Sequence, residues 1–77
     1  MPRWSPCERS SFMRVIRQLG FGGPFSGANH QFMVIAQHRL MLPSNEEYSV
    51  PQLRMMYREV AVMIGREVTC EEWERLL

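Results

Sequence analysis

The chain holds two histidines, no lysine and no aspartate, so few of its side chains can transfer protons near neutral pH. Histidine is the residue whose ordinary titration range spans neutral pH. His30 follows the flexible stretch Gly27-Ala28-Asn29 and opens an apolar segment that runs to Ile35. If the protein catalyses proton transfer, His30 is the candidate general base or acid.

The second histidine, His38, falls in the turn predicted over Ala36-Gln37-His38, at the far end of the strand that His30 begins. An eight-residue separation at about 3.3 Å each places it roughly 25 Å from His30. We therefore expect His38 to be a turn residue outside the site.

Charge is unevenly spread along the chain. Residues 1–42 carry five arginines and one glutamate, a balance of +4, whereas residues 43–77 have a balance of −3. A basic half suits contact with a polyanion on one side, and the planar arginine fork binds phosphate in a bidentate manner. Ordinary solvated charge, or a compositional bias toward arginine, explains the same pattern.

Other common chemistries find no support in the residue types. Cys7 and Cys70 are far apart and fit no metal or redox motif, so we expect free thiols in a reducing cytoplasm. No phosphate loop or zinc cluster is present, and we expect no metal and no cofactor. The longest apolar runs have five residues, too few to cross a bilayer, and the N-terminal residues 1–4 lack the apolar run of a signal peptide.

The spacing of apolar residues predicts three helices and three strands. Phe12, Val15, Ile16 and Leu19 share one helical face. That first helix begins either at a Ser5 cap or nearer Glu8, and it ends at Gly20. A short edge strand around Phe25 precedes strands over residues 30–35 and 39–42, and residues 43–45 break the last strand.

The second helix is predicted from Ser49, with Gln52 completing a capping box and Tyr48 stapled onto Leu53, and it ends at Gly65. Thr69 caps a third, short helix, with Glu72 at the box position and Val68 stapled onto Trp73. The order is α-β-β-β-α-α, an α+β fold in a single domain over residues 1–77.

Strand alternation puts Phe32 and Val34 on one face of the sheet with His30, and Met33 and Ile35 on the other. Both faces are apolar. We expect helices to cover one of them, which leaves the other free for a partner.

In this order and spacing the chain resembles the HicA (YcfA-like) family of bacterial toxins, small ribonucleases of type II toxin–antitoxin pairs. The resemblance covers about residues 9–77 and is carried by FMRVIRQLGF at 12–21, GANHQFM at 27–33, LMLP at 40–43, the helix from Val50, and TCEEW at 69–73.

The resemblance implies a fold like a double-stranded-RNA-binding domain, with a three-stranded antiparallel sheet and helices on one face. It implies a metal-independent endoribonuclease that cleaves mRNA in the cytoplasm. It also implies a HicB-type antitoxin that covers the histidine in a hetero-oligomer. The chain departs from the family pattern in three ways: the loop before His30 is one residue longer than the usual Gly-Ser-His, lysines are absent, and the helix from Val50 runs further.

Within that resemblance, His30 is the proton-transfer group. Gly27 lets an RNA backbone approach closely and the Asn29 amide binds phosphate or ribose, although both residues tolerate positive φ and suit a purely structural turn. The arginines Arg14, Arg17 and Arg39 are the candidates for holding RNA, with solvated cations as the alternative for each.

Two other functions fit the same pattern. One is a non-catalytic RNA-binding module, which would keep the arginines and tolerate loss of His30. The other is a degenerate member of the family that only docks a protein partner through Met33, Ile35 and Met41.

Overall fold

The predicted order of three strands between helices is present in the computed structural model, which describes residues 3–77. Met1 and Pro2, part of the N-terminal stretch examined for a leader segment, lie outside the described residues. The main elements are α1 (Arg9–Gln18), β2 (Gly22–Ser26), β3 (Gln31–Ile35), β4 (His38–Met41), α2 (Val50–Ile64) and α3 (Cys70–Leu76). The α+β class is therefore confirmed.

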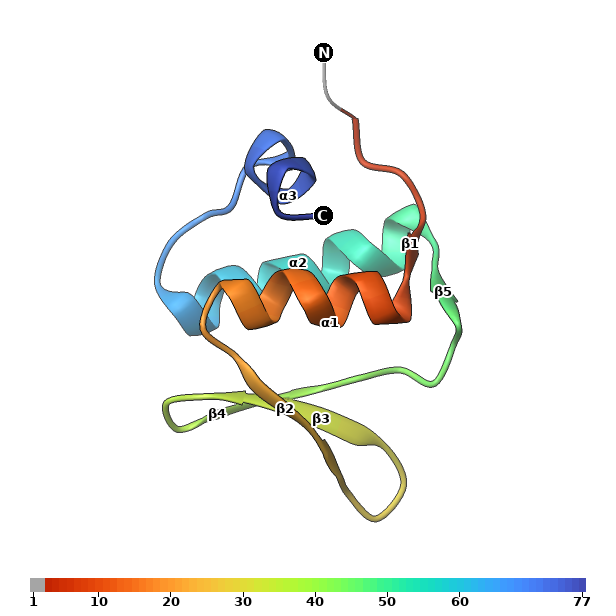
Figure 1. Cartoon of the computed structure of the whole chain (residues 1–77), viewed down its shortest axis with the longest axis vertical. Helices are drawn as coiled ribbons and strands as arrows, with labels where there is room; N and C mark the ends of the chain where they lie inside the picture. Colours follow the sequence, from red (N-terminus) through yellow and green to blue (C-terminus); the bar gives the residue numbers. More distant parts are fainter. Residues whose placement is uncertain (1–2) are drawn as a thin grey trace.

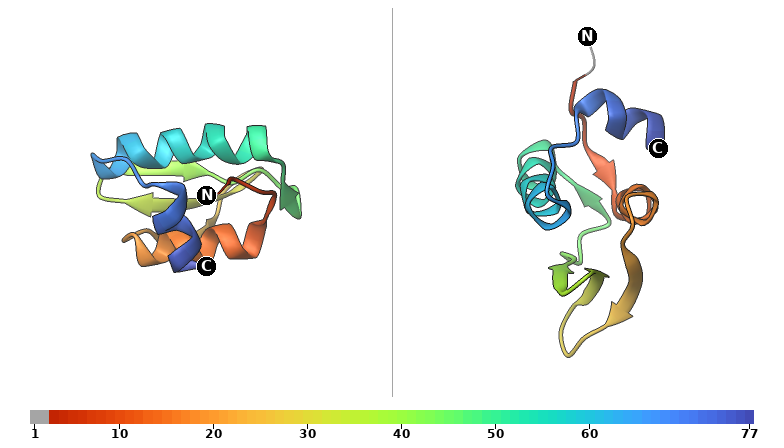
Figure 2. Two further views of the ribbon diagram at one scale, coloured as in Figure 1. Left: turned by 90° about the horizontal axis from the view of Figure 1, so that it is seen from above. Right: turned by 90° about the vertical axis from the view of Figure 1, so that its left-hand side faces the viewer.

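The elements form three layers (Figure 1). Strands β2, β3 and β4 make an antiparallel sheet in the order β2-β3-β4. Helices α1 and α2 lie side by side on one face of that sheet, and α3 crosses them on the side away from it (Figure 2). The prediction that helices cover one face is confirmed, and β2 is the edge strand that its Gly and Pro content indicated.

Aromatic side chains join the helical layers in the core. Phe12 of α1 is fully buried, with its ring 5.6 Å from that of Tyr48 and 5.4 Å from that of Trp73. Trp4 packs against Tyr57 and Trp73, at 4.7 and 6.0 Å between ring centroids. These contacts fix α3 and the N-terminal segment onto α1 and α2.

A two-stranded ribbon that the sequence did not predict joins the segments that lead into α1 and α2, at one end of the helical layer (Figure 1). Strand β1 (Cys7–Glu8) pairs antiparallel with β5 (Glu47–Tyr48). Because residues 7 and 8 are extended, α1 begins at Arg9 with Glu8 at the cap position. The prediction of a start near Glu8 is correct, and the alternative Ser5 cap is wrong.

The caps of the other two helices are confirmed in one half only. The Ser49 hydroxyl accepts from the Gln52 backbone N–H at 3.3 Å, and the Thr69 hydroxyl accepts from the Glu72 N–H at 3.0 Å. The return bonds of a capping box are not formed. The Gln52 side chain donates to Asn45 at 3.2 Å, and the Glu72 carboxylate accepts from Arg66 at 2.9 and 3.0 Å. In each case the side chain at the box position bonds to a residue outside its helix instead of to the cap residue.

The β3–β4 turn is shorter than predicted. It consists of Ala36 and Gln37 alone, with Ala36 at φ +51°, and His38 pairs with Ile35 as the first residue of β4. The interpretation of His38 as a turn residue is therefore wrong by one position. Residues around a turn add no separation along the strand, so five steps of about 3.3 Å give roughly 17 Å between the histidines rather than 25 Å.

The two faces of the sheet differ sharply in exposure. Met33 and its cross-strand partner Leu40 are fully buried under the helices, whereas Phe25 is 49% and Met41 52% exposed. The interpretation of Met33 and Ile35 as a docking surface is therefore wrong, because both pack against the core. We call the uncovered side the open face, and it carries five residues: Phe25, Phe32, Val34, Arg39 and Met41.

One arginine fastens the start of α1 to the sheet. The Arg9 guanidinium donates to the Pro43 carbonyl through Nε at 3.3 Å and to the Gln31 side-chain oxygen through Nη2. The Tyr48 hydroxyl donates to the same Pro43 carbonyl at 2.8 Å. Burial raises the pKa of Tyr48, against the opposing effect of Arg9, so this hydroxyl stays a donor. Together these hydrogen bonds fix the position of Gln31, the first residue of β3, relative to Pro43 in the segment after β4.

We expect Arg9→Met to lower the free energy of unfolding by about 1–3 kcal/mol, because a charged donor is lost while its stem still packs. Tyr48→Phe removes one neutral donor and should cost about 1 kcal/mol. For a domain of this size each kcal/mol lowers the melting temperature by about 4–8 °C, which thermal unfolding by circular dichroism measures. Equal stability of Arg9→Met and the wild type would show that the guanidinium does not hold the sheet.

Candidate functional site

His30 is exposed at the tip of the β2–β3 hairpin, one residue before β3 begins. The register of β3 and β4 continues past their ends through the bond from the Leu42 N–H to the Gln31 carbonyl, at 2.9 Å. That continuation brings His30 opposite Pro43. Gln31, which follows His30 in the chain, and Pro43, which lies opposite it, are the two residues to which the Arg9 guanidinium donates.

His30 lines an open hollow of about 510 Å³ between the end of the sheet and α2. The hollow takes Met41 and residues 42–45 from the chain after β4, and Met55, Met56 and Glu59 from α2. Glu59 and His30 are its ionisable side chains. Met41 also belongs to the open face, so the hollow and that face form one continuous surface around the β4 edge.

Gly27 is required at the hairpin tip for space rather than for an unusual backbone angle. Its N–H donates to the His30 carbonyl at 3.0 Å, and a Cβ at residue 27 would lie 2.6 Å from that same oxygen. Neither Gly27 nor Asn29 has a positive φ, so the connection does not use their tolerance of that conformation. Both residues do lie beside His30 in the connection, and Asn29 is exposed to solvent.

Arg39 is the one predicted RNA contact that lies on the open face. Its guanidinium carbon is 4.6 Å from the ring centroid of Phe32, a cation–π arrangement that holds the guanidinium over this ring. The Phe32 ring in turn lies 3.5 Å from where a Cβ of Gly27 would be. Phe32 therefore lies between Arg39 on one side and Gly27 of the hairpin tip on the other.

Arg14 and Arg17 lie elsewhere. Both are exposed on α1, whose buried side faces the core through Phe12, Val15 and Ile16. Since α1 covers the opposite side of the sheet from Arg39, the structure does not bring these two arginines to the His30 hollow (Figure 2).

Sequence reasoning missed two residues near His30. Arg9 was readable, because it precedes Phe12 by three and Ile16 by seven residues and so lies on the buried face of α1. Glu59 carried no such signal. Glu59 follows His30 by 29 residues and reaches the hollow only because α2 packs along β4.

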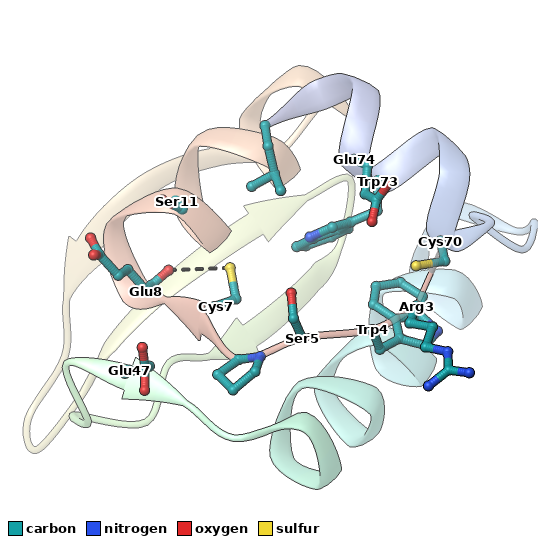
Figure 3. Close-up of a pocket in the computed structure, with 12 residues that line it drawn as sticks. Arg3, Trp4, Ser5, Cys7, Glu8, Ser11, Glu47, Cys70, Trp73 and Glu74 are labelled. Atoms are coloured by element: carbon teal, nitrogen blue, oxygen red, sulfur yellow. Dashed lines mark hydrogen bonds between the residues drawn. The ribbon is translucent and has the colours of Figure 1, made fainter. Parts of the chain in front are cut away.

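A second, more enclosed hollow of about 300 Å³ lies between the N-terminal segment and α3 (Figure 3). Trp4 and Trp73 line it, and Cys7 and Cys70 stand on opposite sides of it. Burial raises the pKa of the Cys7 thiol, with Glu8 adding to the effect, and burial followed by Glu74 raises the pKa of Cys70. Thiols with raised pKa values are weak nucleophiles at neutral pH, so the His30 hollow is the better candidate for chemistry.

Two searches of residues 3–77 bear on other functions. No three histidine, cysteine or glutamate side chains stand together in a way that could hold a metal ion. None of the helices in this part of the chain combines the length and the apolarity needed to cross a membrane.

We expect Gly27→Ala to lower the free energy of unfolding by about 1–3 kcal/mol, because the new methyl group must displace the His30 backbone. Gly22→Ala is the matched control. Its Cβ would meet nothing nearer than 3.9 Å and its φ is not positive, so it should leave stability within about 0.5 kcal/mol of the wild type. Chemical denaturation measures both, and equal effects would contradict the crowding at residue 27.

Both thiols should react slowly with iodoacetamide in the native protein, and Cys7, only 7% exposed, more slowly than Cys70. Because both pKa values are raised, the thiolate fraction is small at pH 7, and the rates should climb as the pH rises past about 9. Mass spectrometry of labelled peptides gives the two rates separately. Labelling of native Cys7 as fast as in the unfolded chain would contradict its burial.

Comparison of the chain with protein-family models, with curated proteins and with solved structures finds no match. The resemblance to HicA toxins therefore remains a hypothesis that depends on the residues themselves, and the function has to be argued from the geometry around His30.

Proposed function

We propose that the protein is an antitoxin-controlled endoribonuclease that cleaves mRNA with His30 as its proton-transfer group. One observation carries the proposal: an exposed imidazole lines a hollow that continues, through Met41, into a sheet face bearing Arg39. A base, a surface to receive the chain and a cation for the phosphate thus lie on one side of the molecule.

The chemistry needs a base for the ribose 2′-hydroxyl, an acid for the leaving oxygen and cations for the phosphorane. The His30 imidazole takes the 2′-hydroxyl proton, the 2′-oxygen bonds to phosphorus, and the bond from phosphorus to the 5′-oxygen breaks. The leaving 5′-oxygen gains a proton from water. The products are a 2′,3′-cyclic phosphate and a 5′-hydroxyl end.

The proposed partner is a HicB-type antitoxin that covers the His30 hollow in a hetero-oligomer. The methionines that line the hollow, Met41 and Met55, are 52% and 60% exposed, and such flexible apolar side chains adapt to a partner surface. The proposed compartment is the cytoplasm, where mRNA is found and thiols stay reduced.

We expect His30→Ala to lower the rate of mRNA cleavage by about 100-fold or more, since a positioned general base contributes about 10²–10⁴. His38→Ala is the matched control, because it removes the other exposed histidine, which lies beside the far end of β3. The measurement is cleavage of a defined mRNA by purified protein, with the product ends identified, alongside growth after induction without antitoxin.

Growth arrest and cyclic-phosphate ends from wild type and His38→Ala, but not from His30→Ala, would support the proposal. Cleavage by all three at matched protein levels would remove His30 from the mechanism. RNA binding without cleavage by any of them would favour the non-catalytic RNA-binding module. Glu59→Gln in the same assay tests whether the one carboxylate that lines the hollow takes part in cleavage.

A further inference from the structure

We propose that the open face binds single-stranded RNA by stacking a base on Phe25, with Arg39 on the neighbouring phosphate. This inference rests on the proposed function, because it names the form of RNA that reaches His30. It adds to the site two aromatic residues, Phe25 and Phe32, that no expectation from the sequence included.

Phe25 lies within strand β2, yet its aromatic ring is exposed to solvent. It is 49% exposed, although it is paired directly opposite Phe32, with ring centroids 5.8 Å apart and planes tilted by 38°. The rings are too close for a base to insert between them, so a base stacks on the solvent-exposed side of Phe25, whose ring packs against Phe32 on the neighbouring strand.

Arg39 lies on the same surface, on the strand at the other side of Phe32. It is exposed, and the Phe32 ring holds its guanidinium at 4.6 Å, which pre-orders a group that otherwise has many rotamers. A stacked base and a phosphate contact on adjacent strands are the arrangement that single-stranded nucleic acid needs.

The charge of this layer favours an anionic partner over a basic or neutral one. No aspartate or glutamate occurs anywhere in residues 9–45, which include the whole sheet, while four arginines and both histidines do. Arg39 is the one of these arginines on the open face, and no strand of the sheet carries a carboxylate that would repel phosphate. A neutral protein would use only the apolar contacts, whereas nucleic acid uses both the rings and the cation.

The open face also leads to the candidate base. Met41 pairs opposite Phe32 and lines the hollow with His30. A strand stacked on Phe25 and held at Arg39 can thus continue around the β4 edge to the imidazole. Paired RNA keeps its bases inside the helix and cannot stack on a protein ring, so the open face favours unpaired segments of mRNA.

The test measures binding of a fluorescent single-stranded RNA, and of a duplex of equal length, to full-length His30→Ala protein, which leaves the RNA intact. Phe25→Ala in that background should weaken single-strand binding about tenfold or more and leave duplex binding unchanged. Phe25→Trp should restore binding. Phe25→Leu keeps an apolar side chain but has no ring, so it should stay as weak as alanine. Val62→Ala, which trims an exposed apolar residue on α2, is the control and should bind normally.

Arg39→Gln in the same background should weaken binding and reduce the salt dependence by about one phosphate contact. Circular dichroism confirms that each variant is folded. Binding by Phe25→Leu as tight as by the tryptophan variant would overturn the proposal, because apolar contact alone would then suffice. Unchanged RNA binding with altered self-association of the Phe25 variants in sedimentation would assign this face to a second copy of the chain instead.

Failure of this inference and failure of the proposed function give different results. If the wild type cleaves mRNA and its Phe25→Ala variant binds and cleaves equally well, the open face is not the RNA surface although the ribonuclease stands. If Phe25 governs single-strand binding but no variant or wild type cleaves, the stacking surface stands and catalysis by His30 does not.

Discussion

The arrangement around His30 depends on one guanidinium placed between layers. Arg9 donates to a backbone carbonyl after β4 and to a side chain at the start of β3, while its own backbone N–H donates to the Glu46 carbonyl at 2.8 Å. A single residue at the start of α1 therefore binds two other segments, the start of β3 and the connection between β4 and β5. Hydrogen bonds to a charged donor are stronger than neutral ones, and this set is partly shielded from water. Without it, the hairpin tip would be joined to the helical layer only through the sheet.

The second constraint is the small size of the domain. With 77 residues the chain has two long helices to cover a sheet whose faces are both apolar in sequence. The strand period of two then decides which side chains are buried. Met33 and Leu40 point toward the helices, so their neighbours Phe32 and Met41 must point away from them. The open face is thus a direct consequence of covering the other one.

Much of the fold could be predicted because its signals are local. The apolar spacing of α1, the Ser49 and Thr69 caps and the Gly65 stop each depend on a few neighbouring residues, and the structure confirms them. The β1–β5 ribbon could not be predicted, since two pairs of residues that lie 41 and 39 positions apart carry no periodicity. The sequence singled out Gly27 in the connection before His30, but not for the reason that the structure shows. A clash with the His30 carbonyl depends on the register of two strands, which the sequence does not show.

The uneven distribution of charge along the sequence becomes a separation of charge along the long axis of the folded molecule. The sheet, free of carboxylates, forms one end of the long axis, and α3 with the segment before it lies at the other end (Figure 1). That far end carries half of the glutamates of the chain: Glu67, Glu71, Glu72 and Glu74. Arg66 and Arg75 offset two of these four charges, so the far end keeps an excess of negative charge while the sheet carries none, which favours encounters of a polyanion with the open face. The net charge of +1 hides this separation, because attraction at close range depends on where charges lie within about 10 Å, roughly one screening length, and not on their sum.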